Sequence, residues 1–255
     1  MVKPRTPLEG VENIFVSSKA IKDGSKAIRG GIPVCFPSFG PWEHGPQHGF
    51  ARSTVWAMDK EPETDPNTGD VKVMLSLKDD EKIRETWNYP FQFLYTFTLK
   101  ARDLILDVNV ANQGERDLEF TFALHTYYKV PDVTQCTISG LQGLTYLDKT
   151  DGGKAKKEEA DEVKLSSFAD RVYQKSPDSV VLRGLQGGRA LTLTKTNLTD
   201  TVVWNPWAEN AKNMADFGDD EYTSMICVEA VQFTEPVSVK PNSHWQATHS
   251  LAVMD

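Results

Sequence analysis

The sequence has few cysteines, and none of them is spaced for metal binding. Its 255 residues contain Cys35, Cys136 and Cys227, with no Cys-x-x-Cys pair. An odd, scattered set argues against a disulfide framework, so we expect reduced thiols and a cytoplasmic protein. A chain of this length buries enough apolar surface to fold without disulfides or a structural metal.

Long apolar runs are also absent. No segment approaches the roughly 20 apolar residues that a membrane helix needs. The first ten residues, MVKPRTPLEG, lack the apolar core of a secretory signal. We therefore expect no membrane partner.

Basic residues are in the minority, and sequence fingerprints for cofactors are missing. The 28 Lys and Arg residues are outnumbered by 36 Asp and Glu, which gives a net charge of −8. This balance argues against nucleic acid as a partner, although two or three local arginines could hold a small anion. Neither a G-x-G-x-x-G nor a Walker motif is present, so we expect no cofactor and no metal.

What the sequence does contain is a succession of alternating, β-branched and aromatic segments with turn residues between them. Helical patterns are scarce, and only residues 79–87 and 209–217 suggest a turn or two of helix. This pattern predicts an all-β fold, a large antiparallel β-sandwich formed by residues 1–255 as a single domain. The expected strands are residues 71–77, 91–99, 104–112, 118–130, 180–184, 190–196, 201–206, 224–233 and 244–254.

Residues 148–163, DKTDGGKAKKEEADEV, are charged and almost without apolar side chains. They could link two domains. Because strand patterning resumes directly afterwards, we interpret them instead as a solvated loop that takes no part in chemistry.

A histidine interrupts the strand pattern FALHTYYKV. Alternate residues of a strand share one face, so Leu118, Phe120, Phe122 and Leu124 form the core face. His125 then lies on the opposite, mixed face, beside Tyr127. It is either a half-exposed histidine without a role or a proton-transfer group.

A carboxylate interrupts the apolar strand SMICVEAVQF. Glu229 shares a face with Cys227 and Val231. A buried unpaired carboxylate is costly, so Glu229 should be paired or have a raised pKa, as a general base near neutral pH requires. The alternative is a structural carboxylate bonded to backbone or to an arginine.

Residues 28–56 form an irregular stretch rich in Gly and Pro, and such loops often carry function. Its polar groups are Arg29, Gln47, His48 and Arg52. Two arginines beside glycine-rich backbone could hold a phosphate, or they could be surface arginines paired with carboxylates.

Several segments together resemble a known family. RGGIPVCFPSFGP, QHGFAR, ETWNYPFQF, ALHTYYKV, FADRVY and VVWNPWAENAKNMADFGDDEY…ICVEA, in this order, resemble the hexose-6-phosphate branch of the aldose 1-epimerase family. The similarity runs over roughly residues 10–252. It implies the galactose mutarotase-like supersandwich and interconversion of the α and β anomers of D-hexose 6-phosphates, with glucose 6-phosphate foremost.

The resemblance also implies roles for individual residues. His125 corresponds to the family's general acid and Glu229 to its general base. Asp170 corresponds to the aspartate that contacts sugar hydroxyls, and the residues that bind the phosphorylated sugar correspond to Arg29, Gln47 and Arg52. His48 could support the site. Trp204, like Trp42 and Trp207, could offer a face to the sugar ring or belong to the core.

Three other functions remain open at this point. The chain could be a mutarotase for unphosphorylated aldoses, a sugar-phosphate binding or regulatory module without turnover, or a metalloenzyme using Glu43, His44 and His48. The last lacks ordinary ligand spacing. We expect a monomer whose partner is a phosphorylated sugar.

Overall fold

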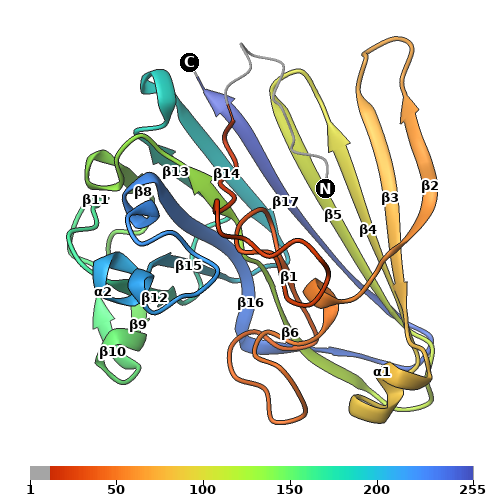
Figure 1. Cartoon of the computed structure of the whole chain (residues 1–255). Helices are drawn as coiled ribbons and strands as arrows, with labels where there is room; N and C mark the ends of the chain where they lie inside the picture. The colour runs from red at the N-terminus through yellow and green to blue at the C-terminus, as the bar shows by residue number, and fades with distance from the viewer. Residues whose placement is uncertain (1–11, 255) are drawn as a thin grey trace.

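The structure, a computed structural model, describes residues 12–254 and contains two antiparallel sheets packed face to face (Figure 1). The first, called here the site sheet, has eight strands in the order β1-β6-β16-β15-β12-β9-β10, with β7 also paired to β16. Its strands are β1 (Val34–Cys35), β6 (Leu118–Leu124), β7 (Tyr127–Lys129), β9 (Thr145–Asp148), β10 (Lys154–Lys157), β12 (Ala169–Tyr173), β15 (Asp200–Asn205) and β16 (Met225–Val239).

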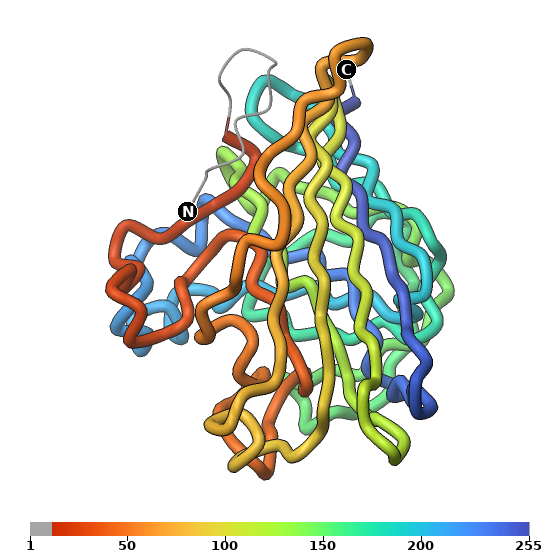
Figure 2. Tube along the Cα trace, turned by 90° about the vertical axis from the view of Figure 1, so that its right-hand side faces the viewer, coloured from red at the N-terminus to blue at the C-terminus, as the bar shows by residue number. Residues whose placement is uncertain are grey.

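The second sheet, called here the long-strand sheet, has nine strands in the order β11-β8-β13-β14-β17-β5-β4-β3-β2. Figure 2 shows its longer strands running side by side down the molecule. Its strands are β2 (Ala57–Thr64), β3 (Val71–Lys78), β4 (Phe91–Leu99), β5 (Asp103–Asn112), β8 (Thr137–Ser139), β11 (Glu162–Val163), β13 (Ser179–Arg183), β14 (Ala190–Thr196) and β17 (His244–Met254).

The main core lies between the sheets and takes side chains from both. The predicted core face of β6 is confirmed, since Leu118, Phe120, Phe122 and Leu124 all belong to it. From β16, Ile226, Val228 and Ala230 join the same core. The intervening residues of β16 therefore point to the other face of the site sheet.

All nine expected strand segments are present, and the predicted sandwich is confirmed. Two boundaries differ most: the segment 118–130 is two strands that break at His125 and Thr126, and the segment expected at 224–233 continues to Val239 in β16. The sequence pattern missed β2, whose eight residues are all exposed and largely charged. It also missed the short strands β1, β8, β9 and β12, because two to five residues give too little periodicity.

The prediction that residues 148–163 form a loop is wrong, although most of these residues are exposed to solvent as predicted. Residues 154–157 form β10 and pair with β9 as a hairpin, and residues 162–163 form β11. Glu158 is buried and accepts hydrogen bonds from the Tyr173 hydroxyl (2.7 Å) and from Arg171 (3.2 Å). Backbone pairing at a sheet edge and this buried carboxylate order a segment that has almost no apolar residues.

Two short α-helices occur in the described residues, as the pattern predicted: α1 (Glu81–Thr86) and α2 (Trp207–Lys212). The side chain of Asp80 accepts a hydrogen bond from the Ile83 N–H and so caps the start of α1. Within residues 12–254, neither helix is long or apolar enough to cross a lipid bilayer.

Candidate active site

The register of the site sheet places one row of side chains on the face turned away from the main core. Asp170 pairs with Trp204, Trp204 with Cys227, and Cys227 with Tyr127. Residues opposite each other in an antiparallel pair share a face. Glu229 lies two residues after Cys227 and His125 two residues before Tyr127, so both point to this same face.

His125 and Glu229 are in contact on that face. The Nδ1 atom of His125 lies 3.4 Å from Oε1 of Glu229, and the two side chains are 9% and 1% exposed. The contact does not have hydrogen-bond geometry, and neither Nδ1 of His125 nor Oε2 of Glu229 has a hydrogen-bond partner among residues 12–254. The reading of His125 as half-exposed is therefore wrong, and Glu229 is not a carboxylate held by backbone or arginine.

Burial shifts both groups toward their neutral forms. It raises the pKa of Glu229 well above its ordinary value, and the nearby Asp170 carboxylate raises it further, while Arg52 opposes the shift. Burial likewise lowers the pKa of His125, and its electrostatic interactions with His48, Arg52 and Arg29 act in the same direction. These shifts disfavour an already protonated His125, although a general acid has to carry a proton when it acts.

Both shifts favour the arrangement in which Glu229 carries a proton and His125 is neutral. Transfer of that proton to His125 yields a carboxylate and an imidazolium without changing the net charge of the pair. The pair can therefore supply a general base and a general acid at the same time.

Asp170 lies on the same face, on β12, which β15 separates from β16, and its charge acts on Glu229. Burial raises the pKa of its carboxyl group, the Lys149 ammonium lowers it, and Asp148 raises it. Lys149 also lies over the Phe233 ring, 5.2 Å from its centroid. The segment that the sequence pattern excluded from chemistry thus contributes an exposed cation beside a predicted site residue.

Two glycines fix the loop that carries the arginines. Gly30 has φ +119°, and a Cβ there would lie 2.5 Å from the Val16 Cα. Gly49 has φ +71°, and a Cβ there would lie 2.2 Å from the Phe36 carbonyl oxygen. Only glycine fits such close backbone approaches, and these two hold the adjacent Arg29 and His48 in place.

The two arginines differ in how their guanidinium groups are used. The half-buried Arg29 donates from Nε to Asp216 (3.2 Å) and from Nη1 to the Tyr127 hydroxyl (3.4 Å). Arg52 donates to the Gln47 carbonyl oxygen (2.8 Å) and, within residues 12–254, has no carboxylate at ion-pair distance. Arg52 also borders a hollow of about 290 Å³ between residues 28–34 and the long-strand sheet. It is the better placed of the two to bind an added anion.

His48 sits edge-on to His125, with ring centroids 5.8 Å apart. Its Nδ1 accepts a hydrogen bond from the Gly40 N–H (3.1 Å), so the proton of the neutral ring is on Nε2. Burial lowers the pKa of His48 to about 3, with Arg52 and Arg29 acting in the same sense. Gln47 is exposed, and its side-chain amide lies 3.2 Å from Nε2 of His48. Because this Nε2 carries the ring proton, the amide oxygen of Gln47 is the group that accepts the hydrogen bond.

Of the three tryptophans considered, Trp204 alone has ring contacts with the acid-base pair, packing edge-on to His125 at 5.8 Å. Trp42 packs against the main core, and Trp207 against the core and Tyr222. Sequence reasoning assigned no role to Tyr127, which stacks on the His125 ring at 4.7 Å and 9°. Its position two residues after His125 was the available signal.

The structure does not bring together the metal-binding set suggested by Glu43, His44 and His48. Glu43 and His44 lie 3.3 Å apart on the exposed surface, while His48 turns toward His125. Within the described chain, the one group with metal-ligand proximity is His125, Cys227 and Glu229.

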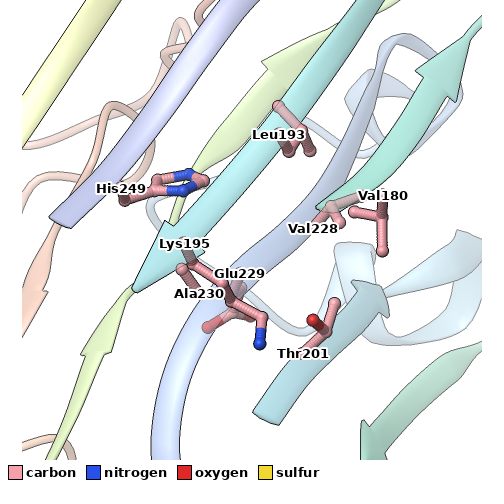
Figure 3. A pocket seen from close by; sticks show the side chains of 8 residues that line it. All are labelled: Val180, Leu193, Lys195, Thr201, Val228, Glu229, Ala230 and His249. Carbon is pink, nitrogen blue, oxygen red and sulfur yellow. The ribbon is translucent and has the colours of Figure 1, made fainter. Parts of the chain in front are cut away.

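A small cavity on the other side of β16 is separate from this site (Figure 3). Its volume is about 10 Å³, room for one water molecule at most. Val228, Ala230 and Leu193 in its wall belong to the main core. Glu229 borders it only as part of β16, because its side chain lies on the opposite face of the strand.

Comparisons with known proteins identify the family of the chain. A family model described as aldose 1-epimerase matches residues 5–252. A Cenchrus ciliaris protein with the provisional name glucose-6-phosphate 1-epimerase is 37% identical over 96% of this chain and 76% of its own length. An Escherichia coli protein with the same provisional name is 29% identical over 95% of this chain and 80% of its own.

A solved structure also superimposes closely. It is a Salmonella typhimurium protein provisionally described as a mutarotase, with a TM-score of 0.88 and 27% identity, covering 98% of this chain and 82% of that one. The two-sheet fold of this chain therefore occurs in a protein that is provisionally described as a mutarotase.

Proposed function

The chain belongs to the aldose 1-epimerase family, and from this premise we propose that it is an isomerase that interconverts the α and β anomers of D-hexose 6-phosphates, glucose 6-phosphate foremost. The observation that carries the proposal is the buried contact of 3.4 Å between His125 and Glu229. The provisional names of the relatives supply the substrate class.

The reaction needs two proton transfers at neighbouring atoms. Glu229, as carboxylate, takes the proton of the C1 hydroxyl, while His125, as imidazolium, gives a proton to the ring oxygen. The C1–O5 bond breaks to give the open aldehyde, rotation about C1–C2 presents the other carbonyl face, and reclosure reverses both transfers. The hydroxyl oxygen and the ring oxygen are both bonded to C1 and therefore lie close together. An acid and a base that are in contact with each other can reach both of these oxygens at once.

The phosphate and hydroxyls of the sugar need a second set of residues. Arg52, which has no carboxylate partner within residues 12–254, is the proposed phosphate contact, and Arg29 supports it from its anchor on Asp216. Gln47 and Asp170 are the proposed contacts to the rest of the sugar, with His48 and Trp204 supporting. Binding of a remote phosphate holds the ring in position for proton transfer. A doubly charged sugar phosphate does not cross a bilayer, which favours a cytoplasmic enzyme.

Anomer exchange measured by NMR tests the proposal. Wild-type protein should accelerate exchange of glucose 6-phosphate above the spontaneous rate. Glu229→Gln and His125→Asn should each lower kcat by roughly 10²- to 10⁴-fold, because each removes one positioned proton transfer.

Circular dichroism and thermal melting serve as the control that both variants remain folded. Near-normal exchange by a folded Glu229→Gln protein would refute the assignment of the base. Equal rates with glucose and glucose 6-phosphate would indicate a mutarotase for neutral aldoses, and binding without exchange would indicate a module without turnover.

A further inference from the structure

Three potential metal ligands meet at the acid-base pair. His125 follows β6, and Cys227 and Glu229 lie two residues apart on the same face of β16. One ligand atom from each lies within 4.8 Å of the other two. Their burial is nearly complete, with residues 7%, 0% and 2% exposed.

Two ligand atoms of this cluster lack protein partners. Nδ1 of His125 and Oε2 of Glu229 are both buried, and neither has a hydrogen-bond partner in the part of the chain that the structure describes. Buried polar atoms in native proteins are normally satisfied, so these atoms are available to an incoming group.

The distances are close to those of a coordinated ion. Zinc bonds of about 2.0–2.3 Å to nitrogen, oxygen and sulfur give tetrahedral edges of roughly 3.3–3.8 Å between ligand atoms. The Nδ1–Oε1 separation of 3.4 Å already equals such an edge. The longest separation in the cluster, at most 4.8 Å, has to shorten by about 1 Å, a shift within reach of side-chain rotation.

The chemistry of the ligands selects the ion. A thiolate, an imidazole and a carboxylate together suit Zn²⁺ or Co²⁺ and are poor partners for Mg²⁺ or Ca²⁺, which take oxygen ligands. Three protein ligands leave a fourth position open.

We propose that His125, Cys227 and Glu229 form a site for one Zn²⁺ ion, and that the bound ion inhibits the enzyme by occupying both proton-transfer residues. The ion is an inhibitor and not a cofactor. The binding of zinc is independent of the proposed function, whereas the inhibition depends on it.

Calorimetric titration of the purified chain with Zn²⁺ tests the binding directly. We expect one site per chain, and Cys227→Ala should weaken it by more than about 100-fold, because loss of even an outer-sphere partner costs roughly 10- to 100-fold. Cys35→Ala is the matched control, since Cys35 is equally buried beside the site but lies outside the three-residue group.

Absorption spectra with Co²⁺ and a second variant, His125→Asn, test the metal site in addition to calorimetry. Co²⁺ should give a thiolate-to-metal absorption band in wild type and Cys35→Ala but not in Cys227→Ala. His125→Asn should weaken Zn²⁺ binding as well, which covers the case that Cys227→Ala folds poorly. Unchanged binding in folded Cys227→Ala, or no binding by wild type, would overturn the site.

Activity measurements separate this inference from the proposed function. If Zn²⁺ binds as described and stops anomer exchange in wild type, while Cys227→Ala exchanges anomers and resists zinc, both stand. If zinc binds but the zinc-free protein has no exchange activity, the site stands and the proposed function fails. If exchange is present and zinc does not bind, only the site fails.

Discussion

At the scale of single residues, Arg52 decides how strongly a phosphate is held. Its guanidinium contacts the Gln47 carbonyl oxygen and has no carboxylate partner within residues 12–254. Arg52→Gln should raise KM for glucose 6-phosphate roughly 10- to 100-fold, because it removes one charge-assisted hydrogen bond to the phosphate. It should lower kcat by a smaller factor, because the phosphate contact also positions the ring. Steady-state kinetics on glucose 6-phosphate and glucose measure it.

Arg183→Gln is the matched control for Arg52→Gln, because Arg183 lies on β13 of the other sheet with a largely exposed side chain. It should leave KM unchanged. An equal loss with unphosphorylated glucose in Arg52→Gln would show that Arg52 acts on the ring and not on the phosphate.

His249 is a buried histidine outside the site, beside the small cavity of Figure 3. Its Nδ1 lies 2.8 Å from the Thr194 carbonyl oxygen, and Nε2 has no partner among residues 12–254. Burial lowers its pKa from 6.5 to about 4, and the neighbouring Lys195 ammonium opposes protonation further. Glu229, the other ionisable residue of the cavity wall, turns its side chain to the opposite face of β16.

The His249 shift predicts a loss of stability in acid. The unfolded chain takes up this proton near pH 6.5 and the folded chain only near pH 4, so the free energy of unfolding falls as pH drops between these values. The shift corresponds to about 3 kcal/mol. Urea unfolding from pH 8 to pH 4 should show a shallower decline in His249→Gln than in wild type.

His44→Gln is the control for this experiment, since the His44 side chain is 53% exposed. It should follow the wild-type curve. Parallel curves for wild type and His249→Gln would contradict the prediction.

At the scale of elements, the loop of residues 28–56 depends on backbone contacts that allow no side chain. Gly49→Ala should destabilise the fold by at least about 3 kcal/mol, because its Cβ would lie 2.2 Å from a carbonyl oxygen at positive φ. Gly24→Ala is the matched control, with φ +85° and nothing within 4 Å of its Cβ. Gly24→Ala should lower the free energy of unfolding by about 1 kcal/mol, because only the left-handed backbone conformation is unfavourable for alanine there.

Urea midpoints of the two glycine variants measure this difference. Similar midpoints would mean that the contact between Gly49 and Phe36 relaxes easily. The sequence predicted that residues 28–56 form an irregular loop, because Gly and Pro mark irregular backbone. It did not predict the shape of the loop, because the close approach of Gly49 to Phe36 arises only in the folded chain.

At the scale of the whole molecule, the main core joins the two sheets. It includes Phe122 and Val228 from the site sheet and Phe93, Leu106 and Leu191 from the long-strand sheet. Because neither sheet has a separate core of similar size in the described residues, we predict that residues 12–254 unfold as one unit.

Differential scanning calorimetry measures this cooperativity. A single transition with equal calorimetric and van't Hoff enthalpies is expected. Two separated transitions would mean that the single-domain prediction for residues 1–255 is wrong.

Local sequence pattern determined the strands and the faces of their residues. The period of two in residues 118–124 and 225–233 is enough to assign Phe122 and Val228 to the core and Glu229 to the other face, because neighbouring side chains must alternate. The family roles of His125, Glu229, Asp170, Arg29, Gln47 and Arg52 came from the resemblance and not from this pattern.

Tertiary structure alone decided which of these side chains meet. The pairing of β16 with β6, β7 and β15 brings His125, Cys227 and Glu229 together and sets Asp170 and Trp204 beside them. The pairing of β16 with β6 and β7 joins segments about a hundred residues apart. Its register depends on the packing of both sheets on one core, which no local periodicity contains. The same holds for β10, whose order comes from its hairpin partner and not from its own charged residues.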